Sequence, residues 1–118
     1  MTTEQLIKQW FEAWEKGDLD NLPISDSFRH TSPFGTIDCK KAYLDLVEKN
    51  RSKFLGQSFE IHDALFESHK ACVRYTARQG EDFSLDVSEW YLVSDNLIQE
   101  IVAYYHIGEI VDSRKLDF

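Results

Sequence analysis

Cysteine, proline and glycine are scarce in this 118-residue sequence, which contains 2, 2 and 5 of them respectively. The two cysteines, Cys39 and Cys72, do not make a disulfide framework. The few glycines are isolated, so there is no glycine-rich phosphate loop. No apolar run approaches the roughly 20 residues of a membrane-spanning helix. The N-terminus is polar and does not have the basic region followed by an apolar region that is typical of a signal peptide. We therefore expect a cytoplasmic protein with reduced cysteines.

Basic residues are also in short supply, with 13 Lys and Arg against 21 Asp and Glu and a formal net charge of −8. A nucleic-acid binder needs a basic face that displaces counterions from phosphates, and no cluster of Lys and Arg supplies one. Binding to acidic membranes is disfavoured for the same reason. Nucleic acid and membrane are therefore excluded as expected partners.

Metal-ligand patterns are missing as well. The four histidines are scattered, with no pair on one helical turn, and the two cysteines have no near partner. We therefore predict no metal and no cofactor. Chemistry without a cofactor is all that the sequence supports.

Hydrophobic residues, by contrast, make up 42% of the chain and aromatic residues 14%. This content supports a packed core, and the length is that of one domain, so residues 1–118 are predicted to form a single domain. Aromatic side chains of this abundance tend to line cores, pockets and interfaces.

The N-terminal part is predicted to be mainly helical. Thr2 and Gln5 can form a capping box that opens a first helix, Gly17 ends it, and a short second helix reaches Leu22 before Pro23. A strand over residues 24–31 and a turn over residues 32–35 then lead to a third helix, roughly residues 39–54, with Asp38 as N-cap and Gly56 beyond its end. The inner faces of the first and third helices are formed by Leu6, Ile7, Trp10, Phe11 and Trp14, and by Tyr43, Leu46, Val47 and Phe54.

After Gly56 the hydrophobic period changes from helical spacing to two. This alternation predicts strands near residues 58–67, 70–79, 82–93 and 97–107. The breaks between them are short enough for hairpins, which favours an antiparallel sheet. Helices followed by a meander of strands indicate an α+β fold.

One acid interrupts an apolar stripe. Glu89 belongs to the alternating run Phe83, Leu85, Val87, Glu89, Tyr91 and Val93, so its carboxylate should project from the buried face of a strand. A carboxylate there must be paired, protonated or facing a cavity, because burying it bare is too costly. The alternatives are a bulge that turns it outward or a structural pair with Arg74 or Arg78.

Three segments carry a resemblance to a known family: WEKGDLD at residues 14–20, SPFG at 32–35 and EWYLVSDNLIQEI at 89–101. Their order and spacing, over roughly residues 4–108, resemble the SnoaL-like branch of the nuclear transport factor 2-like superfamily, which includes ketosteroid isomerase and polyketide cyclases. The resemblance implies a cone-shaped fold in which a strongly curved antiparallel sheet is wrapped on three helices around an apolar pocket. It also implies a homodimer formed through the outer face of the sheet.

The resemblance further places three residues at positions that carry chemistry in ketosteroid isomerase. Ser32 falls at its general base, Trp10 at its oxyanion-binding tyrosine, and Glu89 at the carboxylic acid that donates a hydrogen bond. A serine hydroxyl cannot abstract a carbon-bound proton unaided, and an indole donates a hydrogen bond but cannot share a proton. We therefore do not expect ketosteroid isomerisation itself.

The candidate catalytic residues are Glu89, His30 and His106. His30 lies beside the position of the family's base and could move a proton at neutral pH, or it could be a satisfied or surface histidine. His106 follows Tyr104-Tyr105 at the end of a strand whose register stays open, because apolar residues fall on both faces. The candidate ligand-binding residues are Trp10, Trp14, Phe28, Ser32, Phe34, Tyr43, Phe66, Tyr75, Tyr91 and Tyr105, whereas His62 and His69 are expected to be solvated.

Two functions remain open. The first is a cofactor-free acid–base enzyme of the isomerase, cyclase or hydratase type that acts on a small apolar carbonyl compound. In it a protonated Glu89 would stabilise the oxyanion, and His30 would move the carbon-bound proton. The second is a non-catalytic module of the same fold that binds a small apolar or aromatic ligand or serves only to form a homodimer.

Overall fold

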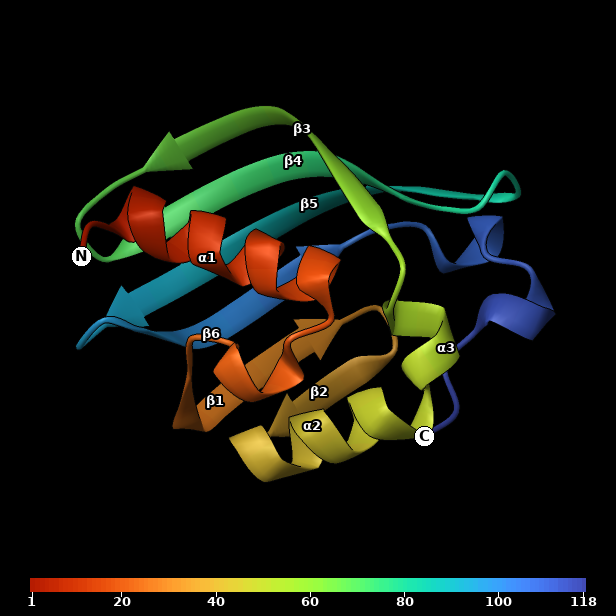
Figure 1. Cartoon of the computed structure of the whole chain (residues 1–118), viewed down its shortest axis with the longest axis horizontal. Coiled ribbons are helices and arrows are strands. Elements are labelled where there is room, and N and C mark those ends of the chain that lie inside the picture. The colour runs from red at the N-terminus through yellow and green to blue at the C-terminus, as the bar shows by residue number, and fades with distance from the viewer.

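The computed structural model describes residues 1–118, apart from the side chain of Glu109. Figure 1 shows helices packed on one side of a single curved sheet. The helical elements are α1 (Thr3–Lys16), η1 (Leu19–Asn21), α2 (Lys40–Lys49), α3 (Arg51–Phe54), η2 (Ile107–Glu109) and η3 (Asp112–Arg114). The strands are β1 (Ile24–Ser32), β2 (Gly35–Asp38), β3 (Ser58–Phe66), β4 (Lys70–Gln79), β5 (Phe83–Ser94) and β6 (Leu97–Tyr104).

The six strands lie in the order β2-β1-β6-β5-β4-β3. The predicted α+β class, the curved sheet and the helices packed against it are confirmed. The prediction of a purely antiparallel sheet is wrong at one place, because β1 pairs with β6 in parallel and every other pair is antiparallel. An alternating pattern fixes which face of a strand is buried, but it carries no information on the direction of a partner far away in the chain.

Helix α1 forms as the sequence predicts. Thr2 and Gln5 make both hydrogen bonds of the capping box, and Gly17 ends the helix in the left-handed conformation, with a φ of 70°. The predicted apolar stripe is buried, and the rings of Trp10 and Trp14 meet edge to face at 5.6 Å. This stripe forms one wall of the core, opposite the inner face of the sheet.

The third predicted helix is interrupted, so that α2 and α3 flank Asn50. Its N-cap is Cys39 and not Asp38, since the Cys39 sulfur accepts a hydrogen bond from the backbone N–H of Ala42. Asp38 instead ends β2, a short strand that the sequence did not predict. The Asn50 side chain donates to the carbonyl of Leu46 in the preceding turn, a local side-chain bond of the kind that competes with a continuous helix.

The four C-terminal strands begin within one residue of the predicted positions, and the loop between β5 and β6 turns on Asp95 and Asn96, both with positive φ. Two-residue turns of this kind match the twist of antiparallel strands. The last strand is shorter than predicted, because the chain leaves the sheet after Tyr104. Among the described residues, no helix combines the length and hydrophobicity needed to cross a membrane.

Candidate functional site

Glu89 lies on the inner face of the sheet, as its sequence pattern predicts. It sits in the middle of β5 with Val73 of β4 and Ala103 of β6 as its cross-strand neighbours, and the pairing on both sides is regular at this point. Only 6% of the residue is exposed to solvent. A bulge that turns the carboxylate outward is therefore excluded.

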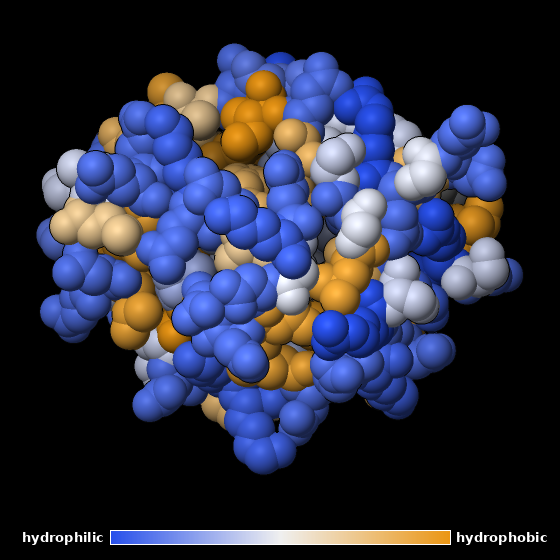
Figure 2. Space-filling view, in the orientation of Figure 1, coloured by the Kyte–Doolittle hydropathy of each residue, from blue (hydrophilic) through white to orange (hydrophobic). Residues whose placement is uncertain are grey.

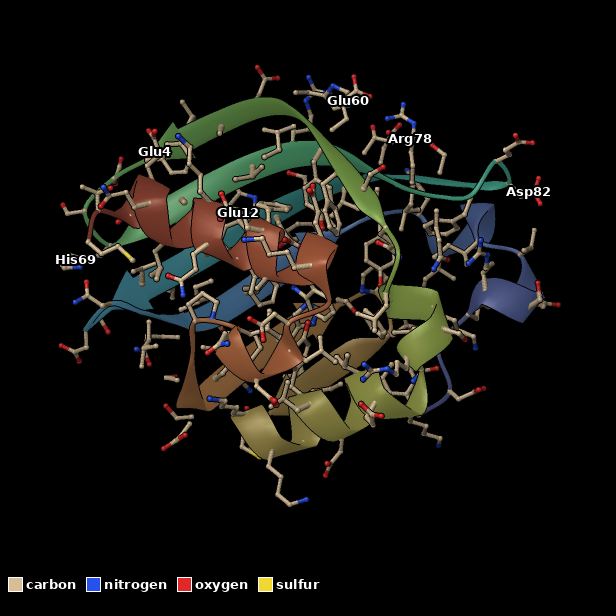
Figure 3. All side chains as sticks on the ribbon, in the orientation of Figure 1. Glu4, Glu12, Glu60, His69, Arg78 and Asp82 are labelled. Atoms are coloured by element: carbon tan, nitrogen blue, oxygen red, sulfur yellow. The ribbon has the colours of Figure 1, made fainter. Side chains whose placement is uncertain are left out.

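The two arginines that could have paired with Glu89 are engaged on the outer face. Arg74 forms an ion pair with Asp63, and Arg78 forms one with Glu60. Figure 3 shows Glu60 and Arg78 together at the outer edge of the sheet. Glu89 takes part in none of the ion pairs formed by the described residues.

The partners of the Glu89 carboxyl are two buried tyrosines. Tyr75 donates its hydroxyl hydrogen to Oε2 at 2.8 Å, and Tyr91 donates to Oε1. Burial raises the pKa of Glu89 above its ordinary value, and the two tyrosine hydrogen bonds oppose this rise because they favour the carboxylate. The structure thus holds an acid that is easier to protonate than a solvated glutamate and whose two oxygens are held in fixed positions.

The tyrosines near Glu89 stay neutral. Burial, followed by the nearby negative charge of Glu89, raises the pKa of Tyr75, Tyr91 and Tyr43 well above the ordinary value. Their hydroxyl groups therefore keep their protons at physiological pH and act as hydrogen-bond donors rather than bases.

His30 reaches the same interior from β1. Its ring lies 5.1 Å from the ring of Tyr43 and 6.2 Å from that of Phe28, measured between centroids. Burial among these rings lowers the pKa of His30 to about 4. The imidazole is neutral at pH 7, so one ring nitrogen can accept a proton while the other carries a hydrogen.

Glu89 and His30 face one cavity of about 150 Å³, which opens between the helices and the inner face of the sheet. Space-filling atoms in Figure 2 show a mainly hydrophilic face, with hydrophobic atoms visible between the end of α1 and α3. Of the residues predicted as catalytic or ligand-binding, those that line this cavity are Glu89, His30, Trp10, Trp14, Ser32, Phe34, Tyr43, Tyr75 and Tyr105.

The remaining predicted site residues lie elsewhere. Phe28 is fully buried in the core, as is Tyr91, which acts on the site only through its bond to Glu89. Phe66 ends β3 away from the cavity. His106 is exposed, since it follows the last strand instead of belonging to it, and it does not join Glu89 and His30.

The two histidines predicted to be solvated are both exposed. His62 bonds to the Thr76 hydroxyl on the outer face, and Thr76 donates in turn to Asp86. His69 lies in the turn between β3 and β4, at the far left of the molecule in Figure 3. Neither is near the cavity.

Ser32 and Tyr105 add hydroxyl groups to the cavity lining. The Ser32 hydroxyl accepts a hydrogen bond from the backbone N–H of Phe34 at 3.1 Å. Burial raises the pKa of Tyr105, and a hydrogen bond with Ser32 opposes the rise. Both groups can hold a ligand oxygen, but neither is a base at neutral pH.

Sequence reasoning missed the contribution of the C-terminal residues. Ile110, Arg114, Leu116 and Phe118 all line the cavity, although they follow the last strand. The sequence held a weak signal for this, because Ile110, Leu116 and Phe118 are apolar residues in a stretch rich in charged ones. Without a periodic pattern, nothing in the sequence tied them to the pocket.

No cluster of three or more metal-ligating side chains occurs among the described residues. The polar groups that line the cavity are one acid, one neutral imidazole, hydroxyls, an amide and the side chains of Lys53 and Arg114, set among aromatic rings. Such a set can donate, accept and relay protons in an apolar surrounding, which is the chemistry of general acid–base catalysis.

Comparison with known proteins gives a family and a fold. The profile of the SnoaL-like domain matches residues 7–101. No match is found among curated protein sequences.

Several solved structures are similar. An NTF2-like protein of unknown function from Cytophaga hutchinsonii superposes with a TM-score of 0.79 at 16% identity, over 92% of this chain and 94% of that one. An LEH-like epoxide hydrolase from M. tuberculosis superposes with a TM-score of 0.76 at 17% identity, over 91% of this chain and 86% of that one. A candidate ketosteroid isomerase from Kribbella flavida superposes with a TM-score of 0.73 at 16% identity, over 86% of this chain and 76% of that one. At these identities the likeness shows a shared fold alone.

Proposed function

The chain belongs to the SnoaL-like domain family, and we propose that it catalyses cofactor-free acid–base chemistry, of the isomerase, cyclase or hydratase type, on a small apolar carbonyl compound. The observation that carries the proposal is the pairing of a buried Glu89, whose pKa is raised, with a neutral His30 across one apolar cavity. Groups with separated pKa values in a shared pocket are a recurrent arrangement for acid and base roles.

Glu89 is the proposed acid. When protonated, it donates its O–H to the carbonyl oxygen of the ligand as negative charge builds there. Tyr75 and Tyr91 continue to donate to the carboxyl oxygens and so keep the group aimed at the ligand. No arginine or lysine holds the carboxyl in its ionised form, since its shift arises from burial and the two tyrosines.

His30 is the proposed base. Its neutral ring accepts the proton from the carbon next to the carbonyl. The electron pair of that C–H bond forms a C=C bond, and the π pair of the carbonyl moves onto its oxygen as the enolate forms. For an unsaturated ligand the product is a conjugated dienolate, and return of the same proton to its far carbon gives the isomer and restores the neutral ring. Charge that builds on the oxyanion favours the imidazolium that appears in this step, and thereby offsets the low pKa of His30 in the empty pocket.

The test is deuterium exchange into 2-cyclohexenone in D₂O, followed by ¹H NMR. We expect the protein to accelerate exchange next to the carbonyl, and Glu89→Gln and His30→Gln each to lower the rate by about 10²-fold or more. Glu60→Gln, on the outer face, is the matched control and should exchange like the parent. Equal rates in all four proteins would overturn the acid–base proposal.

The alternative is a binding module of the same fold without catalysis. It is favoured by Ser32 and Trp10, since these residue types cannot supply the base and the proton-sharing donor that the resemblance places there. Binding of cyclohexenone without any accelerated exchange would support this alternative.

We further propose that two copies of the chain associate through the outer face of the sheet. The cross-strand register aligns Leu65, Cys72, Trp90 and Val102 in one row over four strands. Trp90 is 47% exposed, and the exposed side chains of Leu92 and Tyr104 flank the row. An apolar row of this kind on an outer face supports burial against a two-fold copy.

Sedimentation velocity tests this assembly. We expect a dimer at micromolar concentration and a monomer for Trp90→Lys, because a lysine in the centre of the row would have to be desolvated without a partner. A monomeric parent protein at that concentration would contradict the proposal.

A further inference from the structure

The C-terminal segment, residues 107–118, forms part of the pocket wall. It leaves β6 and makes the turns η2 and η3 at the right-hand end of the molecule in Figure 1, beside the tip of the β4–β5 hairpin and α3. Ile110, Leu116 and Phe118 present apolar side chains to the cavity. The ring of Phe118 lies 5.6 Å from that of Phe34, which lines the cavity from the turn between β1 and β2.

Asn50, at the interruption between α2 and α3, fastens this segment. Its side chain donates to the carbonyl of Asp117 at 2.9 Å and accepts from the backbone N–H of Asp117 at 2.7 Å. Asn50 is only 2% exposed, so these bonds are shielded from water. A buried amide with its hydrogen bonds satisfied holds its partner firmly, because leaving it unpaired is costly.

Two cations strengthen the attachment. Lys53 donates to the carbonyl of Lys115 and pairs with the Asp117 carboxylate at 3.5 Å. Arg114 donates to Gln79 and stacks over the ring of Phe83, with its guanidinium carbon 4.8 Å from the ring centroid. The segment is thus joined to α3, β4 and β5.

With the segment in place, the cavity measures about 150 Å³. An apolar cavity of roughly this size holds one benzene molecule. Leu116 and Phe118 line this cavity, so trimming their side chains enlarges the space open to a larger ligand. The C-terminal segment is therefore one of the walls that limit the size of the cavity.

The charges around the cavity set a second limit. Lys53 and Arg114 line it, but both are engaged within the protein, with Asp117 and with Gln79 and Phe83. The other ionisable groups that line it are Glu89, His30 and three tyrosines, and burial favours the neutral form of each. An anionic or cationic ligand would be desolvated there without a compensating partner.

We infer that residues 107–118 restrict this pocket to a neutral ligand the size of a single six-membered ring, with one polar oxygen to meet Glu89, and that they exclude fused-ring molecules. The inference rests on the proposed function for its site, but it concerns which molecules fit rather than whether they react.

Binding measurements by tryptophan fluorescence test it, because Trp10 and Trp14 line the cavity. The probes are 2-cyclohexenone, the bicyclic ketone 1-tetralone, a tetracyclic steroid ketone and the anion cyclohexanecarboxylate. We expect the parent protein to bind cyclohexenone at least about tenfold more tightly than each of the other three probes. The double variant Leu116→Ala/Phe118→Ala should gain at least about tenfold in affinity for 1-tetralone, since the added space buries the second ring.

The matched control is Val111→Ala, an exposed position in the same segment outside the cavity lining, which should keep the parent selectivity. Equal binding of the steroid and cyclohexenone by the parent protein would overturn the inference. Tighter binding of the anion, no binding of cyclohexenone, or an unchanged preference in the double variant would do the same. Selective binding without deuterium exchange would defeat the acid–base proposal and leave the size limit standing.

Discussion

Glu89 and Glu60 lie within the same sheet and show opposite chemistry. Glu89 projects from the inner face of β5 between two tyrosines, and burial raises the pKa of its carboxyl. Glu60 projects from the outer face of β3 in water, where the hydrogen bond and charge of Arg78 lower its pKa. The two residues have the same side chain, so the face to which the strand register assigns each one determines whether its carboxyl is buried with a raised pKa or is a solvated surface charge.

The test with the largest expected effect adds a carboxylate to the inner face of the sheet. Val73 is buried and lies directly opposite Glu89 across β4 and β5. We expect Val73→Asp to lower the free energy of unfolding by about 4 kcal/mol or more, since burial can shift a carboxyl by 3–5 pKa units at 1.36 kcal/mol each.

The control is Ser84→Asp, which puts the same side chain on the outer face, opposite Arg78. We expect a change within about 1 kcal/mol in either direction, because exposed charges contribute little. Urea denaturation at pH 7 measures both variants. Similar losses of unfolding free energy in the two variants would show that the face of the sheet does not control the cost of adding a carboxylate.

The second test concerns His30, whose pKa is lowered to about 4 by burial. Its neutral form is the one the fold accommodates, so its contribution to stability is complete above the unfolded pKa of about 6.5 and is lost as the pH falls towards 4. The difference between these values corresponds to about 3 kcal/mol. Relative to His30→Gln, the parent protein should therefore lose about that much unfolding free energy between pH 7 and pH 4.

Chemical denaturation at several pH values checks this prediction, with His69→Gln as the control in a solvated turn. Parallel pH profiles for the parent and His30→Gln would mean that the imidazole is protonated in the folded protein at little cost.

The third test removes one of the hydrogen bonds that hold Glu89. Tyr75→Phe deletes the donor to Oε2 and leaves the ring in place. We expect a loss of about 1–3 kcal/mol in the free energy of unfolding at neutral pH, the cost of leaving a buried acceptor unpaired. The pKa of Glu89 should rise further, because the lost bond favours the carboxylate. A ¹³C NMR titration measures the pKa, and an unchanged or lowered value would contradict the assignment.

Much of this comparison could be predicted from the sequence, because it depends on local patterns. Alternation placed Glu89 on the buried face, and the period change after Gly56 located four strands. The capping residues Thr2 and Gln5 fixed the start of α1. Each of these features is encoded by residues within a few positions of one another, where side-chain spacing decides the structure.

The rest depends on residues distant in the chain. The parallel pairing of β1 with β6 and the attachment of Asp117 to Asn50 join segments more than 60 residues apart. The tyrosines that hold Glu89 were identified only as aromatic residues of a pocket, because the partner of a hydroxyl depends on cross-strand register. His106 was misplaced for a related reason, since the end of β6 is set by where the chain turns to cover the pocket.

The test with the smallest expected effect is also the one that separates the two carboxyls most selectively. Raising the salt concentration from about 0.05 M to 0.5 M shortens the range of electrostatic interactions between exposed charges to a few ångströms, but it changes interactions inside the protein much less. The pKa of Glu60 should therefore rise towards its ordinary value as the attraction of Arg78 is screened, whereas the pKa of Glu89 should stay where burial and the two tyrosines hold it. One ¹³C NMR titration series at the two salt concentrations follows both carboxyls in the same sample, so each serves as the control for the other. If the pKa of Glu89 moved with salt as much as that of Glu60, a screened charge and not desolvation would be setting it, and the case for a buried acid facing the pocket would fail.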